Sequence, residues 1–178
     1  MENHPNIFDL DPNAKTRHYK KGEIIQRKGE VSTHTFYVKQ GLLRSYIIDS
    51  KAKEHIFMFA PEGWIIADVE SLEFRAPIEL YIDCLEDSEV IVFNRDCLLQ
   101  PDTSQDLIIQ NAKLLYRRMG VLQRRIIMQM SSPAVDRYNY FVQTYPELTQ
   151  RIPQHMIASY LGITPQALST IRGKKIKK

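Results

Sequence analysis

Hydrophobic and polar positions alternate with a period near two through the first half of the chain. Five short segments rich in β-branched and aromatic residues show this pattern: 34–39, 42–48, 55–59, 78–84 and 89–93. We predict that each is a strand, because side chains of a strand point alternately to opposite faces. Glycines and other turn residues separate these segments at fairly regular intervals. The pattern predicts an antiparallel, jelly-roll-like β-roll over residues 1–102.

Between about residues 103 and 130 the period changes to that of a helix, which Thr103 or Ser104 can cap. Apolar residues recur there at alternating spacings of four and three: Ile108, Ala112, Leu115, Met119, Leu122 and Ile126. This is a heptad seam, and we predict that it pairs with the same helix of a second copy. The alternative is one wide apolar stripe packed within the chain. Four arginines are expected on the solvated face of this helix: Arg117, Arg118, Arg124 and Arg125.

A third pattern fills residues 131–178. Pro133 breaks the long helix, and a helix over 134–144 follows. From Gln154 onward the residues match a helix-turn-helix position by position. Gly162 can end the first helix in a left-handed conformation, while Thr164 and Pro165 suit the start of the second. The remaining matching positions hold apolar or small residues that would face inward: Ile157, Ala158, Leu161, Ile163, Leu168 and Ile171. The alternative is an ordinary helical hairpin with no role in binding DNA.

In a helix-turn-helix the second helix lies in the major groove of DNA. Its outward residues would include Gln166 and Arg172, which can contact adenine and guanine edges through two hydrogen bonds each. Gln154 and His155, at the start of the first helix, are placed for contacts with the DNA backbone. The complete set of candidate DNA-binding residues is Gln154, His155, Thr164, Pro165, Gln166, Ser169, Thr170, Arg172, Lys174 and Lys175. We expect the wing that often accompanies such a unit to be short or absent after the second helix.

The distribution of charge agrees with this assignment. The chain has a formal net charge of +3. Residues 131–178 contain seven Lys or Arg and two acidic residues, whereas residues 1–130 contain the other 17 basic and 19 acidic ones. A basic C-terminal part on a slightly acidic remainder favours a polyanion-binding end, although a solvated basic tail would have the same charge.

Other classes of protein are disfavoured. The sequence lacks an apolar run long enough to span a membrane and lacks a secretory signal, so we expect a cytoplasmic protein without membrane contact. Two cysteines, Cys84 and Cys97, are too few for a disulfide framework and are expected to be reduced. The sequence offers no nucleophile motif, phosphate loop or metal-ligand spacing, so we do not expect an enzyme or a metal site.

A strand-rich first part, a long helix and a C-terminal helix-turn-helix together resemble the Crp/Fnr (catabolite activator-like) transcription factors. The sequence of residues 21–29 and 36–44 is similar to the first strands of their cyclic-nucleotide-binding-type β-roll. The sequence of residues 83–92 is similar to its last strands. The resemblance implies an α+β fold, a homodimer, and a two-fold symmetric site on double-stranded DNA. RNA polymerase is a further partner that it implies.

The ligand chemistry of that family does not transfer cleanly. Its nucleotide-binding members hold the ribose and phosphate with a Gly-Glu pair and, some ten residues later, an Arg-Ser pair. Here the first pair reads Gly63-Trp64, and the second falls near Glu79, with Arg75 close by. An acid would repel a phosphate, and no arginine stands in the matching place. These four residues are a possible ligand pocket, but we do not expect cyclic AMP. Trp64 would then line the core or the pocket.

Other cofactors of the family are also not expected. An iron–sulfur cluster needs four cysteines, and the chain has two. Haem is unsupported, because His34 and His55 are isolated histidines in predicted strands. The sequence therefore predicts a homodimeric, sequence-specific DNA-binding regulator with an unidentified effector. The alternative is a receptor for a cyclic nucleotide or another small ligand, in which the β-roll pocket is the functional site.

Overall fold

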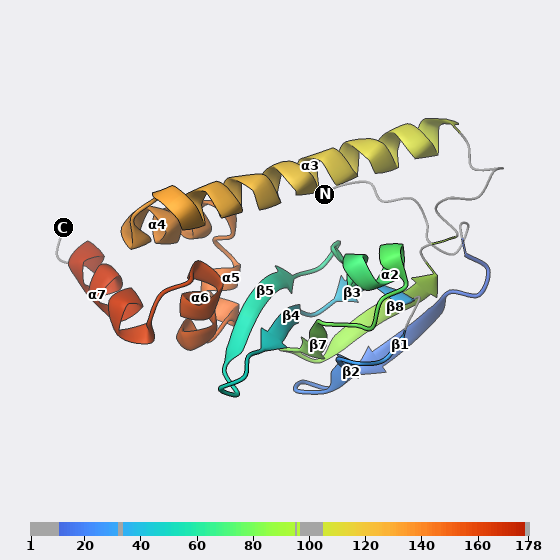
Figure 1. The fold of residues 1–178 in the computed structure, drawn as a ribbon, viewed down its shortest axis with the longest axis horizontal. Coiled ribbons are helices and arrows are strands. Elements are labelled where there is room, and N and C mark those ends of the chain that lie inside the picture. Colours follow the sequence, from blue (N-terminus) through green and yellow to red (C-terminus); the bar gives the residue numbers. More distant parts are fainter. Residues whose placement is uncertain (1–10, 32–33, 95, 97–104, 177–178) are drawn as a thin grey trace. The chain divides into compact units, whose positions relative to one another are not determined.

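The computed structural model describes residues 11–31, 34–94, 96 and 105–176 (Figure 1). The chain divides into two compact units, the first ending at Ile108 and the second beginning at Ile109. The first unit is an antiparallel β-roll and the second is helical, so the predicted α+β class is confirmed. The division into domains 1–102, 103–130 and 131–178 stays a prediction.

The β-roll consists of two four-stranded antiparallel sheets. The first sheet has the order β1-β8-β3-β6 and the second the order β2-β7-β4-β5. The strands are β1 (Lys15–Tyr19), β2 (Ile24–Gln26), β3 (His34–Gln40), β4 (Leu43–Ile48), β5 (Glu54–Ala60), β6 (Ile65–Ile66), β7 (Tyr81–Cys84) and β8 (Ser88–Asn94). A short helix, α2 (Val69–Phe74), lies between β6 and β7 in the sequence. Four of the five predicted strands agree closely with β3, β4, β5 and β8, whereas only the second half of 78–84 forms a strand.

The core of the roll is formed by alternate residues of facing strands. Phe36, Val38 and Val90 of one sheet pack in one apolar cluster with Leu43 and Ile82 of the other, and all five side chains are buried. Cys84 belongs to the same cluster, and burial raises the pKa of its thiol to about 12. Such a thiol stays protonated at physiological pH, as expected for a structural cysteine. Cys97 lies outside the described residues.

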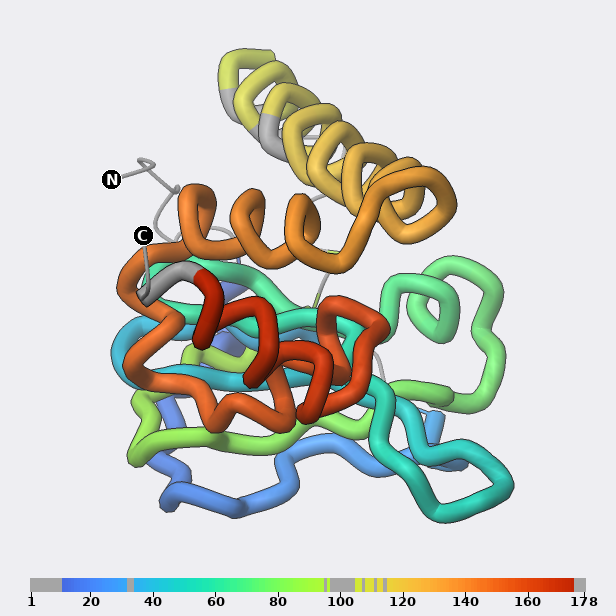
Figure 2. The backbone as a smooth tube through the Cα atoms, turned by 90° about the vertical axis from the view of Figure 1, so that its left-hand side faces the viewer, coloured from blue at the N-terminus to red at the C-terminus, as the bar shows by residue number. Residues whose placement is uncertain are grey.

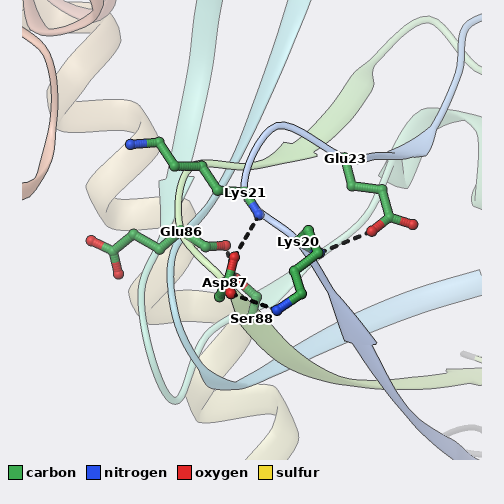
Figure 3. Close-up of polar contacts among 6 residues, drawn as sticks. All are labelled: Lys20, Lys21, Glu23, Glu86, Asp87 and Ser88. Carbon is green, nitrogen blue, oxygen red and sulfur yellow. Dashed lines mark hydrogen bonds and ion pairs between the residues drawn. The ribbon is translucent and has the colours of Figure 1, made fainter.

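Two turns at one end of the roll are joined by polar contacts (Figure 3). The Lys20 ammonium group and the Lys21 backbone N–H both donate to the carboxylate of Asp87, each at 2.9 Å. These contacts connect the β1–β2 turn to the β7–β8 turn. Gly41, which precedes β4, has a φ of +99° and lies so close to Ser88 that any side chain there would collide with it. This end of the roll is thereby fixed by both polar contacts and close backbone packing.

The described residues of the second unit form five helices, and Figures 1 and 2 show the path of the chain through them. They are α3 (Gln105–Ser131, of which the first turn belongs to the first unit), α4 (Ala134–Thr144), α5 (Leu148–Arg151), α6 (Gln154–Leu161) and α7 (Pro165–Ile176). The predicted break at Pro133 separates α3 from α4, and the predicted helix 134–144 is confirmed. The caps expected at Thr103 or Ser104 lie outside the described residues. No helix within the described ranges has the length and apolarity needed to span a membrane.

Candidate nucleic-acid interface

The corner between α6 and α7 is formed by residues that end one helix and start the next. Gly162 has left-handed φ and ψ of 66° and 37°, and its N–H bonds to carbonyls of the preceding turn. The N–H of Ile163 donates to the Ala158 carbonyl at 3.0 Å. The Thr164 hydroxyl oxygen accepts from the Ala167 N–H at 3.2 Å, directly before α7 begins. The predicted C-terminal glycine and N-cap threonine are therefore confirmed.

The inner faces of the two helices pack on α4. Ile157, Ala158 and Leu161 of α6 and Leu168 of α7 are buried, each with no more than 4% of its surface exposed. The Phe141 ring of α4 lies 5.5 Å from the Tyr160 ring of α6, measured between centroids. The two helices α6 and α7 thus share a small hydrophobic core with α4.

The outer face of α7 is polar. Its exposed residues are Pro165, Gln166, Ser169, Thr170, Gly173 and Lys174. The Thr170 hydroxyl donates to the Gln166 carbonyl at 3.0 Å, so its proton is used within the helix and its oxygen remains an acceptor. The Gln166 side chain carries both a donor and an acceptor, as recognition of adenine through two hydrogen bonds requires.

Arg172 lies at the edge between the two faces and not on the outer face as expected. It is half-buried, and it lines a hollow of about 230 Å³. The other lining residues are Tyr138, Val142, Thr149, Gln150, Ile157 and Leu168. The reason is helical geometry, because four residues turn a helix by about 400°, which places Arg172 roughly 40° from the buried Leu168. A contact between Arg172 and a base therefore stays a prediction that requires its side chain to swing outward.

The remaining candidate DNA-binding residues lie at helix ends. Gln154 and His155 are exposed in the first turn of α6, which follows Pro153. The N-terminal end of a helix carries partial positive charge, which suits a phosphate. Lys175 is part of α7, but its side chain is outside the described residues.

The seam of α3 is largely exposed. The exposed fractions of Ile108, Leu115, Met119, Leu122 and Ile126 lie between 38% and 67%, and Ala112 is half-buried. Apolar side chains exposed in this way suit an interface, and the pairing of the seam with a second copy stays a prediction.

The arginines of α3 do not all lie on a solvated face. Arg125 is half-buried, its guanidinium carbon lies 3.9 Å from the centroid of the Tyr160 ring, and it donates to the Tyr160 carbonyl at 3.0 Å. This role was not predicted from the sequence. An arginine four residues after Val121 and three before Met128, and so near an apolar face, was the available signal.

The four residues of the possible ligand pocket have separate surroundings. Gly63 is in the turn before β6 with a φ of +81°, and the half-buried Trp64 packs on the core cluster of the roll. Arg75 is exposed and ends α2 in a left-handed conformation with a φ of 51°. Glu79 is exposed and pairs with Lys28 at 2.6 Å. Trp64 thus serves the core, and the Glu79 carboxylate faces a lysine.

Asp68 is the buried acid in this part of the roll, and it was not predicted from the sequence. Its carboxylate accepts from the backbone N–H of Ser71 at 3.1 Å, of Glu79 at 2.9 Å and of Leu80 at 3.0 Å. Backbone N–H groups of this kind are the donors that a phosphate would use. Here a side chain of the protein takes them. Its position three residues before Ser71, as a helix N-cap, was the signal that could have revealed it.

The candidate metal ligands of the described residues do not gather in one place. They bring together no group of three or more His, Cys, Asp or Glu side chains able to hold a metal ion. The isolated His55 pairs with Asp49 at 2.8 Å. The expectation that the chain uses no cofactor stays a prediction.

Comparison with known proteins supports the same architecture. Residues 16–100 match the family model of the cyclic nucleotide-binding domain. No curated protein gives a significant match. The structure of a CooA mutant from Carboxydothermus hydrogenoformans is similar with a TM-score of 0.75 and 19% identity, over 99% of this chain and 81% of that one.

Two further solved structures are similar over most of their length. FixK2 from Bradyrhizobium japonicum has a TM-score of 0.71 and 20% identity, over 90% of this chain and 83% of that one. A CRP/FNR-family transcriptional regulator from Thermus thermophilus has a TM-score of 0.69 and 15% identity, over 92% of this chain and 86% of that one. Residues 16–100 are therefore a cyclic nucleotide-binding-type domain, in a chain that has the fold of the Crp/Fnr regulators.

Proposed function

We propose that this protein is a sequence-specific DNA-binding transcriptional regulator that acts as a homodimer. The observation that carries the proposal is the exposed polar face of α7, presented by a corner that Gly162 and Thr164 fix. Inserted into a major groove, α7 would place Gln166 and Ser169 against base edges. Lys174 and the N-terminal end of α6 would meet phosphates, which position the unit without reading sequence.

The homodimer supplies the affinity that one small unit lacks. The base-facing surface is modest, and a single copy would bind weakly. Pairing of the exposed α3 seams would join two units, so that the second half-site binds at a high effective concentration. Two-fold symmetry would then require two half-sites about one DNA turn apart.

The β-roll would act as sensor or scaffold, and we do not expect cyclic AMP as its effector. Asp68 occupies three backbone N–H groups in the segment where a phosphate would have to bind. The alternative function, a small-ligand receptor, is separated from this proposal by calorimetry. Micromolar binding of cyclic AMP to the purified protein would favour the receptor.

We propose neither an enzymatic activity nor a membrane role. RNA polymerase remains a candidate partner of the DNA-bound dimer, as it would be for any regulator that activates transcription. Co-purification of polymerase with the protein on its selected operator would test this part.

The proposal predicts different effects for two residues of α7. Gln166→Ala should relax the choice of base at one position per half-site, which costs about 1–3 kcal/mol of discrimination. Lys174→Ala should weaken binding to all sequences alike and reduce the dependence of affinity on salt by about one phosphate contact. Gel shifts with a selected sequence and with its single-base variants, in moderate salt, measure both. Equal behaviour of the two variants on every sequence would show that α7 does not read bases.

A further inference from the structure

One backbone carbonyl in the last turn of α6 accepts hydrogen bonds from side chains of α3. Helix C-terminal carbonyls have no partner within their own helix and need donors from elsewhere. The N–H groups of Gly162 and Ile163 serve the carbonyls of Ala158 and Ser159. The carbonyl of Tyr160 instead accepts from the Arg125 guanidinium at 3.0 Å and from the Gln129 amide at 3.3 Å.

Both donors come from one face of α3, because residues four apart lie one above the other on a helix. Arg125 also stacks on the Tyr160 ring, with its guanidinium carbon 3.9 Å from the ring centroid. Arg125 is half-buried, and this burial lowers the pKa of its guanidinium group. The positive charge lies at the negative end of the α6 dipole, which is a favourable position.

Gln129 meets the corner itself. A Cβ atom built on Gly162 would lie 2.7 Å from the Gln129 side-chain oxygen, so this amide covers the glycine at close range. Arg125 and Gln129 therefore contact α6 at its C-terminal end, and Gln129 also contacts the corner where the chain turns toward α7. We call these two residues, with Tyr160, the α3 clamp.

We propose that the α3 clamp fixes the orientation of the helix-turn-helix on α3, so that Arg125 and Gln129 are positioning residues for DNA recognition. This inference rests on the proposed function, because it concerns how the two readers of a dimer are held relative to the α3 seam. Neither residue is expected to touch DNA. They act through the Tyr160 carbonyl and the corner, and α7 begins five residues after Tyr160.

A small change of angle at the α3 clamp would displace the far end of α7 considerably. α7 has 12 residues and is about 18 Å long at 1.5 Å per residue. A tilt of about 10° at the corner would move its far end by roughly 3 Å, which is enough to break a hydrogen bond to a base. One half-site could still be bound, because a single unit can re-seat itself. Two half-sites at fixed spacing could not both be met without strain.

The consequence for DNA is tested with full-length protein on a selected two-half-site operator, on a single half-site, and on operators with changed spacing. Arg125→Met should weaken binding to the two-half-site operator by about tenfold, a change of about 1.4 kcal/mol, and leave half-site binding almost unchanged. Its preference for one spacing should flatten. Gln129→Leu should show the same pattern, and Arg125→Lys should recover part of the loss. Lys113→Met, which removes an exposed cation of α3, is the matched control and should change none of these ratios.

A second measurement works without DNA. Spin labels at Gly120 of α3, which has open space around it, and at Lys174 of α7 report the angle between the helices as a distance distribution. Labelled protein is diluted with unlabelled protein, so that only distances within one chain count. The distribution should be narrow in the parent and broad with Arg125→Met.

The outcomes are distinct. An unchanged distance distribution, or an equal loss on the half-site and the two-half-site operator, would overturn the clamp. Absence of selective DNA binding by the parent protein would instead remove the proposed function, and the spin-label distances would still decide whether the clamp holds α6.

Discussion

Arg44 forms a buried ion pair on which the stability of the β-roll depends. It lies on β4 with 6% of its surface exposed and forms two hydrogen bonds of 2.8 Å with the carboxylate of Asp83. It also bonds to Glu54 and stacks on Tyr46 at 4.2 Å. Burial alone would lower the pKa of Arg44, but the hydrogen bonds that Arg44 donates to the two carboxylates outweigh this effect and raise the pKa. The charge is therefore permanent, and the pair must stay together.

Removing one partner of this pair should be costly. Arg44→Met leaves Asp83 buried without its cation, and we expect a loss of roughly 3–5 kcal/mol in the free energy of unfolding. The double variant Arg44→Met with Asp83→Leu should recover most of it. Lys28→Met, which breaks an exposed pair with Glu79, should have no measurable effect. Denaturant unfolding measures all three. Equal effects of the buried and the exposed variant would contradict this account.

The ionisation of Asp49 predicts how the stability of the fold depends on pH. The hydrogen bond from His55, followed by those from the backbone of Lys53 and Lys51, lowers the pKa of Asp49 from 3.8 to about 2. A lowered carboxyl pKa stabilises the fold above the ordinary value, and this contribution disappears as pH falls toward the lowered one. The melting temperature of Asp49→Asn should lie below that of the parent at pH 6 and converge with it between pH 3.8 and 2. Glu70→Gln, at an exposed carboxylate of the same unit, is the control, and a difference that persists at pH 2 would argue against the mechanism.

At the scale of elements, the helix-turn-helix could be predicted well from the sequence because every position there has a local cause. The capping residue, the glycine at the turn and the spacing of the inward apolar residues can all be recognised in the sequence. Three strands were missed. β2 and β6 have three and two residues, too few for a period to appear, and β1 is mostly polar and exposed, so it shows no alternation. The strand predicted at 78–84 begins only at Tyr81, because Asp68 takes the N–H groups of Glu79 and Leu80. Such long-range contacts leave no local pattern.

Gly162 and Gly120 should respond to alanine in opposite directions. Gly162→Ala places a side chain at a φ of +66° and against Gln129, and the conformation alone costs about 1–2 kcal/mol. Gly120→Ala lies within α3 with open space around it and should stabilise the helix by about 0.5–1 kcal/mol. Thermal unfolding compares the two. A tolerated alanine at Gly162 would mean that the corner relaxes more than the structure indicates.

At the scale of the whole molecule, the proposed function depends on two copies of the chain. The placement of the seam was visible in the sequence, but the roles of Arg125 and Arg172 were not, because they depend on how α4, α6 and α7 pack. The exposed apolar seam on the 27-residue helix α3 supports the proposed pairing with a second α3. The basic C-terminal part then occurs twice in the assembly, once for each half-site.

The dimer should be sensitive to charge on the seam. Leu115→Glu combined with Met119→Glu should shift sedimentation of the protein from dimer to monomer, because like charges would face each other across the two-fold axis. Lys113→Glu, on the same helix but outside the seam, should leave the dimer intact. If both proteins sediment alike, α3 does not form the interface.

The measurement that tests the central claim most directly is selection of the full-length protein on random double-stranded DNA. We predict enrichment of one inverted repeat whose half-sites lie about 10–10.5 base pairs apart, centre to centre, as two α7 helices on one face of DNA require. Gln166→Ala should select the same repeat with one position relaxed in each half. Recovery of no motif, or of a single unpaired half-site, would contradict the assignment of a dimeric, sequence-specific regulator.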